Sequence, residues 1–132
     1  MRRTGRRFLE FTAILLTALQ LRCGLSDTAG PGRAPGTLTL LVASPRGAEG
    51  AALIEIDRDN VTALSGSTGT VLASLNGNRL RVALLLARPG IPQLSVSVRD
   101  TMQPLNAVLL EVADSFNVLR PSLQGYSLVE SK

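Results

Sequence analysis

From residue 36 to the end of the chain, short apolar or alternating stretches are separated by clusters of Gly, Pro, Asn and Asp. Alternation of apolar and polar residues is the pattern of a strand with one buried face, and strands repeated at short intervals are typical of sandwiches and barrels. The stretches that we expect to form strands are 37–43, 52–57, 61–64, 70–75, 79–87, 94–99, 107–113 and 126–129. The pattern therefore predicts an all-β domain over residues 36–132, an antiparallel β-sandwich of about seven or eight strands.

Three of these stretches alternate so regularly that their core-facing side chains can be named. They are Leu38, Leu40 and Val42 in the first stretch, Ala52, Ile54 and Ile56 in the second, and Leu94, Val96 and Val98 in the sixth. The stretch 79–87 begins by alternating and then becomes continuously apolar, which predicts that its second half is buried on both faces. Between 70–75 and 79–87, Asn76-Gly77-Asn78 supplies residues that adopt positive φ, so we expect a tight β-hairpin there.

Residues 105–118 are open to two interpretations. Their Leu, Ala and Glu residues favour a helix, whereas the strand rhythm on both sides favours a strand, which is the interpretation that we adopt, with a helix as the alternative. Phe116 is the only Phe after the first 22 residues, and we expect it in the core. Tyr126, the only Tyr, is expected to be a partly buried residue of the closing strand.

The first 22 residues have the layout of an export signal. Residues 1–7 carry four arginines, and an apolar stretch of eleven residues follows at 11–21. That length is typical of a signal peptide and falls short of the ~20 residues that a membrane-spanning helix needs. We therefore expect residues 1–22 to form a helical signal segment and the mature protein to be exported. Arg6-Arg7-Phe8-Leu9 also resembles a twin-arginine export signal, with a spacing one residue shorter than that pattern.

Cys23, the single cysteine of the chain, directly follows the apolar stretch. This arrangement resembles the lipobox of bacterial lipoproteins, in which the cysteine is acylated and becomes the first mature residue. The lipobox has a small residue just before the cysteine and an aliphatic residue three positions before it, whereas this chain has Arg22 and Gln20. The resemblance implies a lipid anchor on Cys23 and a place in the bacterial cell envelope, periplasmic or at the cell surface. Cleavage without a lipid, or an uncleaved anchor, are the alternatives.

Residues 23–35 are rich in Gly, Pro, Ala and Ser, which is the composition of flexible linkers. We expect this segment to be a flexible tether that lets a lipid-anchored domain stand off the bilayer. The alternative is an N-terminus that is merely disordered. The predicted organisation is thus a signal peptide over 1–22, a tether over 23–35 and a sandwich over 36–132.

The net charge of +4 and the isoelectric point near 10.6 belong to the leader. Five arginines and one glutamate precede Cys23, and the nine basic residues that follow are balanced by nine acidic ones. Arg79 and Arg81 lie on one predicted strand face, which is a solvated face or, alternatively, an anion site. Binding to phosphate backbones needs a basic surface, and base stacking needs aromatic side chains, which make up only 3% of the chain. We therefore expect no nucleic-acid partner.

The residue types that carry most enzyme chemistry are missing. The chain has no histidine, which excludes a Ser-His-Asp triad and His metal ligands, and its one cysteine lies at the anchor position. We therefore expect a protein that is not an enzyme and that binds no cofactor. A small hydrolase that uses a pair of carboxylates, with Glu111 or Asp114 as one member, is the third hypothesis for function.

One turn carries the only candidates for a metal site. Asp57, Asp59 and Asn60 place three oxygen-bearing side chains close together in sequence, and Ca²⁺ takes six to eight such oxygens. The alternative, which we favour, is a turn whose Asp and Asn side chains cap their own backbone, with no metal bound. The sequence 60–62 also matches the glycosylation sequon, which we interpret as chance in a chain with a bacterial type of leader.

A family resemblance rests on the order of the strands. The segment 52–64, an apolar strand followed by an aspartate, a short turn and an aliphatic strand, resembles the β-sandwich of cohesins and carbohydrate-binding modules from bacterial surfaces. The pairing of 79–87 with 94–98 is also similar. The likeness covers residues 36–130, although the chain is shorter than a typical cohesin. It implies an immunoglobulin-like sandwich that binds a protein or a glycan.

The function that we expect from the sequence is that of a non-enzymatic binding or structural module. The protein would be a cell-envelope lipoprotein that contacts the membrane through its N-terminal anchor. A carbohydrate-binding module is the alternative. Sugar-binding modules stack sugar rings on aromatic side chains, and the domain has only Phe116 and Tyr126, which counts against that alternative.

Overall fold

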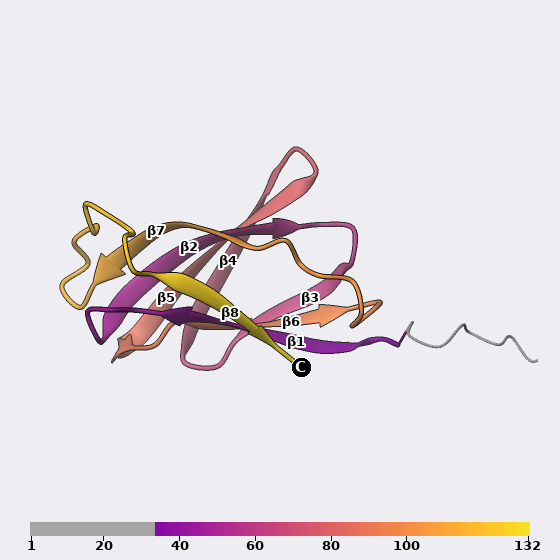
Figure 1. Cartoon of the computed structure of the whole chain (residues 1–132), viewed down its shortest axis with the longest axis horizontal. Coiled ribbons are helices and arrows are strands. Elements are labelled where there is room, and N and C mark those ends of the chain that lie inside the picture. Colours follow the sequence, from indigo (N-terminus) through magenta and orange to yellow (C-terminus); the bar gives the residue numbers. More distant parts are fainter. Residues whose placement is uncertain (1–33) are drawn as a thin grey trace, which may run out of the picture. The chain divides into compact units, whose positions relative to one another are not determined.

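The computed structural model describes residues 34–132, which form two packed β-sheets (Figure 1). The strands of this part are β1 (Gly36–Ala43), β2 (Glu49–Asp57), β3 (Val61–Gly66), β4 (Gly69–Asn76), β5 (Arg79–Gly90), β6 (Gln93–Val98), β7 (Val108–Asp114) and β8 (Ser127–Ser131). One sheet has the order β3-β6-β1-β8 and the other β4-β5-β2-β7, and all neighbours run antiparallel. The predicted all-β sandwich is confirmed, and the architecture is compatible with an immunoglobulin-like fold.

The predicted leader lies outside the described residues. This holds for the signal segment over 1–22, for Cys23, and for all but the last two residues of the predicted tether 23–35. Residues 34 and 35 lead into β1 without regular structure. In the part of the chain that the structure describes, no helix is long and apolar enough to cross a membrane.

The core between the sheets is built from the residues that alternate along the strands. Its buried members are Leu38, Leu40, Val42, Ala52, Ile54, Ile56, Val82, Leu84, Leu94, Val96, Val98, Leu105 and Val112. The nine side chains that alternation assigned to the core are all at most 3% exposed, so this prediction is confirmed. Removing such side chains from water is the main force that favours folding. Here the buried side chains of the two sheets pack against each other in one core.

The second half of β5 is not buried on both faces, and here the sequence prediction was wrong. Leu84 is only 3% exposed, but its neighbour Leu85 is 45% exposed and Ala87 also faces solvent. The sheet that contains β5 packs on one face only, and no element of residues 34–132 covers its outer face. A continuous apolar stretch does not reveal whether a second face of the sheet is covered, and that is why the pattern misled.

The segment 105–118 contains strand β7 and no helix, so the strand interpretation is confirmed. Phe116, however, is not in the core: it is 85% exposed in the turn that follows β7. In this turn the backbone N–H of Asn117 donates to the carbonyl oxygen of Asp114, and Asn117 has a φ of +61°. The chain therefore reverses at Phe116 and leaves its ring outside. Tyr126 lies just before β8 and is half-buried, as expected.

The predicted β4–β5 hairpin is present. Asn76 pairs with Arg79, so Gly77 and Asn78 form a two-residue loop. Gly77 occupies the first loop position with a φ of +61°, a conformation that L-residues other than glycine adopt rarely. The local Asn-Gly signal was therefore sufficient to locate this turn.

The connections gather at two opposite ends of the sandwich. We call one the loop end; it consists of residues 44–48, 67–68, 91–92 and 115–126. Strand pairing brings these loops together, because Glu49 lies opposite both Gly90 and Asp114. We call the other the entry end; it consists of residues 34–35, 58–60, 77–78 and 99–107. The N–H of Thr101 donates to the carbonyl of Ala34 there, and Figure 1 shows the chain entering opposite the loop before β8.

Candidate functional site

The turn that the sequence marked as a candidate for Ca²⁺ does not bring its side chains together. The carboxylate of Asp57 accepts hydrogen bonds from Arg79 at 2.6 Å and from Asn106 at 2.5 Å. Asp59 accepts a longer one, at 3.4 Å, from Asn78 in the hairpin. Among residues 34–132 there is no group of three or more His, Cys, Asp or Glu side chains that could hold a metal ion. The carboxylate oxygens of Asp57 and Asp59 instead accept hydrogen bonds from neighbouring parts of the chain.

Asn60 is the third member of that turn, and its side chain connects two loops by hydrogen bonds. It is 3% exposed, accepts a hydrogen bond from the N–H of Asp100 at 3.0 Å and donates to the carbonyl of Asp100 at 2.8 Å. These bonds join the β2–β3 loop to the β6–β7 loop, forty residues away in sequence. The amide nitrogen that a glycan would modify is thus buried and bonded, which agrees with a chance match to the sequon.

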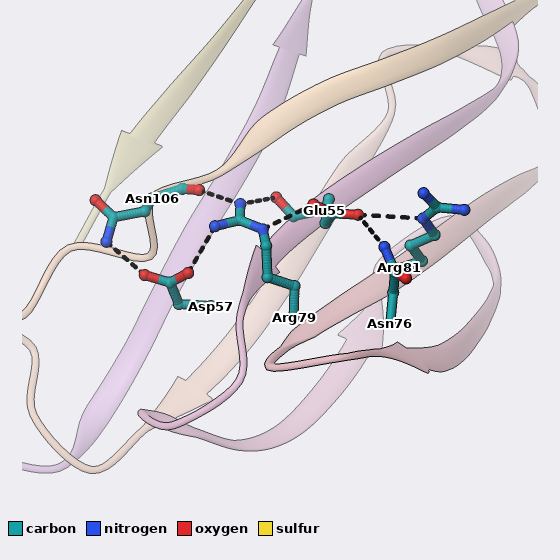
Figure 2. A network of polar contacts seen from close by, with 6 residues as sticks. All are labelled: Glu55, Asp57, Asn76, Arg79, Arg81 and Asn106. Atoms are coloured by element: carbon teal, nitrogen blue, oxygen red, sulfur yellow. Dashed lines mark hydrogen bonds and ion pairs between the residues drawn. The ribbon is translucent and has the colours of Figure 1, made fainter.

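Arg79 stands at the centre of a polar network on the outer face of the β4-β5-β2-β7 sheet (Figure 2). Its guanidinium group makes ion pairs with Glu55 at 2.8 Å and with Asp57 at 2.6 Å. It also donates to the carbonyl of Asn106 at 2.7 Å. Arg81 makes a further ion pair with Glu55 at 3.1 Å. The two arginines therefore face two carboxylates, which leaves no excess positive charge here for an anion.

The network follows from the strand register. Glu55 pairs with Arg81 and Asp57 pairs with Arg79, so opposite charges lie side by side across β2 and β5. Asn76 adds a hydrogen bond to Glu55 at 3.0 Å. The hydrogen bonds from Asn76 and Arg81 lower the pKa of Glu55 below its ordinary value. This arrangement ties the hairpin and the loop before β7 to β2, and we assign it a structural role.

The least expected feature of the molecule is a buried carboxylate, Glu49, at the start of β2. It is 0% exposed and accepts hydrogen bonds from Ser44 at 2.7 Å and from Tyr126 at 2.5 Å. Arg120 completes the cluster with an ion pair at 3.0 Å. The four residues, which we call the Glu49 cluster, come from the β1–β2 loop, from β2 and from the loop before β8. The cluster therefore joins the two sheets at the loop end.

An irregularity in β2 explains why Glu49 points inward. The register with both neighbouring strands shifts between Glu49 and Ala51, which is the signature of a β-bulge. A bulge changes which face a side chain takes, so Glu49 no longer follows the alternation of Ala52 and Ile54. Gly50 lies in the bulge and is buried; a side chain there would meet the backbone oxygen of Asp114. Glycine therefore lets β7 approach β2 closely at this point.

The cluster lowers the pKa of its carboxylate. Burial raises the pKa of Glu49, but the hydrogen bonds from Tyr126, Ser44 and Arg120 outweigh burial and hold it below its ordinary value of 4.5. A carboxyl group with a lowered pKa in the folded state stabilises the fold above its unfolded-state pKa. That stabilisation is lost as the pH falls through the lower, folded-state pKa.

A pH titration of stability should detect this. The free energy of unfolding of the unaltered chain is expected to fall as the pH drops below about 4.5, and the fall should be smaller in Glu49→Gln. Urea unfolding at a series of pH values measures both. Glu55 and Asp114 also have lowered pKa values, so the difference between the two proteins, and not the slope of one, isolates Glu49. Parallel curves for the two proteins would contradict a charged Glu49 in the fold.

The residues around the cluster hold an apolar turn in a defined position. The carboxylate of Asp114 accepts hydrogen bonds from the N–H groups of Phe116 at 2.9 Å and Val118 at 3.0 Å, which lowers the pKa of Asp114. The N–H of Arg120 donates to the carbonyl of Val112 at 2.8 Å. The turn is thus tied at both ends, and Phe116 is held at its apex.

The loop end exposes four large apolar side chains. Phe116 is 85% exposed, Val118 and Leu119 are each 60% exposed, and Ile91 in the β5–β6 connection is 57% exposed. Two open grooves, of about 460 and 280 Å³, lie on either side of Ile91. They are lined by Leu41, Ala43, Ala48 and Gly90 on one side and by Thr68, Leu86, Ala87 and Pro89 on the other. Large apolar side chains exposed at the same end of a domain are candidates for an interaction site.

The charges at the loop end are not balanced in the same way as those of the Arg79 network. Arg46 in the loop end and Arg88 on β5, which lines a groove with Ile91, are exposed, and neither makes an ion pair with any residue from 34 to 132. Of the two carboxylates nearby, Glu49 is buried and paired with Arg120, and Asp114 accepts hydrogen bonds from backbone N–H groups of the turn that follows it. The loop end is therefore apolar and positively charged, and it is our candidate functional site.

The other residues singled out in the sequence do not meet in a cleft. Glu111 is exposed on β7, and Asp114 faces the backbone of the turn after it. Tyr126 is half-buried and its hydroxyl donates to Glu49, so in the described part of the chain Phe116 is the one fully exposed aromatic ring. A platform of several stacked rings is absent from residues 34–132.

Sequence analysis did not find the Glu49 cluster. Arg120 and Tyr126 lie 71 and 77 residues after Glu49, so no local motif connects them. The one local sign is Gly50 next to a charged residue at the start of an apolar strand, because glycine inside a strand often marks a bulge. The predicted lipid site, Cys23, lies outside the described residues. Comparison of the chain with protein-family models, with curated proteins and with solved structures finds no match.

Proposed function

We propose that the chain is an exported, lipid-anchored β-sandwich that acts as a non-enzymatic binding module of the bacterial cell envelope. One observation carries the proposal: the exposed apolar loop end lies opposite the end at which residue 34 enters the sandwich. A module anchored through Cys23 would hold its entry end by the tether and leave its loop end free to bind.

The arrangement of the carboxylates supports a binding function over catalysis. Hydrolases of the carboxylate type need two carboxyl groups that face the same substrate. In the described residues, Glu49, Glu55 and Asp57 are each engaged by arginine or amide neighbours. We therefore propose no reaction for this protein, and no cofactor.

The finer family likeness also remains a proposal. Two four-stranded antiparallel sheets agree with the cohesin and carbohydrate-binding type of sandwich that the sequence resembles. Of the two functions that this likeness implies, glycan binding is the less favoured, because Phe116 is the one open ring in the described part. We propose that the module recognises its partner through apolar and charged contacts rather than by stacking on sugars.

Anchoring can be tested by fractionating cells that produce the full chain. After a high-salt wash, the unaltered protein is expected to stay with the membranes, and Cys23→Ser is expected to move to the soluble extracytoplasmic fraction. Ser26→Ala, which alters a nearby small residue, is the matched control and should stay with the membranes. Retention of Cys23→Ser equal to that of the unaltered protein would argue for an uncleaved anchor and against a lipid on Cys23.

A further inference from the structure

We propose that the loop end docks onto the anionic lipid surface of the same membrane that carries the anchor. The inference rests on the proposed function for its location and goes beyond it by naming the partner. It is carried by two features of the loop end: apolar side chains held in a defined turn, and arginines nearby that outnumber the carboxylates without an ion pair in the described residues.

The apolar side chains have the form that an interfacial anchor needs. Phe116, Val118 and Leu119 belong to a turn that Asp114 holds by two hydrogen bonds, and Ile91 comes from a neighbouring connection. These side chains are exposed to solvent. A partner protein would need a pocket of matching shape to bind them. A bilayer interface accepts protruding aromatic and aliphatic side chains at any lateral position.

The charges favour an anionic lipid surface. Arg46 and Arg88 are exposed beside the apolar side chains, and the structure gives them no ion pair within residues 34–132. Each arginine near an anionic surface favours binding by about fivefold, or ~1 kcal/mol. The charge of Glu49 is compensated by its ion pair with Arg120. Asp114 keeps its negative charge, since its partners are neutral N–H groups, so Arg46 and Arg88 leave one excess positive charge in this region of the described residues.

The same charges argue against a second copy of the chain as the occupant. In a symmetric dimer the same patch of each copy meets its equivalent. Contact through the loop end would therefore bring Arg46 and Arg88 of both copies together, and the described residues there offer only Asp114 as a carboxylate without an ion pair. Like charges placed together at an interface oppose association.

The length of the tether allows the loop end to reach the membrane. The thirteen residues from Cys23 to residue 35 span at most about 45 Å when extended. The eight residues of β1, which run from the entry end to the loop end, span ~26 Å. The tether is therefore longer than the strand, and the domain can turn its loop end toward the bilayer that holds the anchor.

Two tryptophan reporters in the full chain test the proposal, because the chain has no tryptophan of its own. Phe116→Trp places the reporter at the loop end. Met102→Trp is the matched control, since Met102 is 63% exposed at the entry end. Each purified full chain is added to vesicles of equal parts phosphatidylglycerol and phosphatidylcholine whose acyl chains carry bromine, a contact quencher of tryptophan fluorescence.

We expect bromine to quench the Phe116→Trp reporter at least about twice as strongly as the Met102→Trp reporter. Equal quenching, or stronger quenching of Met102→Trp, would overturn the proposal, because the tether alone brings the entry end closer to the bilayer. Protection of Phe116→Trp from a water-soluble quencher in the absence of vesicles would also overturn it, in favour of a second copy or another segment of the chain as the occupant. Failure of the proposed function looks different: Cys23 would carry no acyl group, whichever end contacts lipid.

A charge variant tests the electrostatic part separately. In the Phe116→Trp background, Arg88→Gln is expected to lower the ratio of docked to undocked protein about fivefold on anionic vesicles. Arg58→Gln, an equally exposed arginine at the entry end, should leave the ratio unchanged. If both variants lower the ratio equally, the attraction comes from the charge of the whole domain, and docking by the loop end is refuted.

Discussion

Replacing Glu49 by leucine is expected to lower the free energy of unfolding by about 3 kcal/mol. The carboxylate is fully buried and is the common partner of Ser44, Arg120 and Tyr126. Leucine has a similar size, so the loss comes from polar groups left without a partner and not from a cavity. The bonds that are lost connect the two sheets at the loop end, and urea unfolding of the purified chain measures the effect.

The same substitution at an exposed carboxylate is the control. Glu111→Leu on β7 should change the free energy of unfolding by less than about 0.5 kcal/mol. The double variant Glu49→Leu with Arg120→Met should be more stable than Glu49→Leu alone, because removing both partners leaves no uncompensated charge. A cost for Glu49→Leu no larger than that for Glu111→Leu would show that the cluster does not hold the sheets together.

Replacing Ile54 by alanine is expected to cost about 3 kcal/mol of folding free energy. Ile54 is 0% exposed on β2, a strand that is hydrogen-bonded to both β5 and β7. The substitution removes buried methyl and methylene groups and leaves a cavity between the sheets. Thermal or urea unfolding of the purified variant gives the loss directly.

Leu72→Ala is the matched control for the core substitution. Leu72 lies on the edge strand β4 and is 57% exposed, so its truncation should change stability by less than about 0.5 kcal/mol. If the two truncations had equal costs, the outer face of the β4-β5-β2-β7 sheet would have to be covered. The description of that sheet as packed on one face only would then be wrong.

The parts of the fold that could be predicted are those with a local cause. Alternation placed Leu38 and Ile54 in the core because a strand packed on one side has a period of two residues. Asn76-Gly77 located the hairpin because positive φ is a property of a few residue types. The strand β7 followed from the rhythm of its neighbours, which prevailed over a composition that also suits a helix.

What could not be predicted depends on residues far apart in sequence. Leu85 is exposed because no element of the described part covers its sheet face, and composition carries no information about that cover. Phe116 is exposed because Asp114 and Asn117 turn the chain at that point. Glu49 is buried because a bulge turns it inward and because Arg120, 71 residues later, returns to it.

The candidate site shows the same division. The sequence placed Arg79 and Arg81 on one strand face. That their charges are compensated by carboxylates follows only from the register, which sets Glu55 opposite Arg81. The loop end could not be recognised at all from the sequence. Its members come from four separate connections, and the pairing of Glu49 with Gly90 and Asp114 brings three of them together.

We propose a binding module that is anchored at Cys23 and binds through its loop end. Intact-mass spectrometry of the protein extracted from membranes is the most direct test of the anchor. We expect a mass equal to residues 23–132 plus a diacyl or triacyl group. The unmodified mass of the full chain, or of any shorter chain without acyl groups, would contradict it.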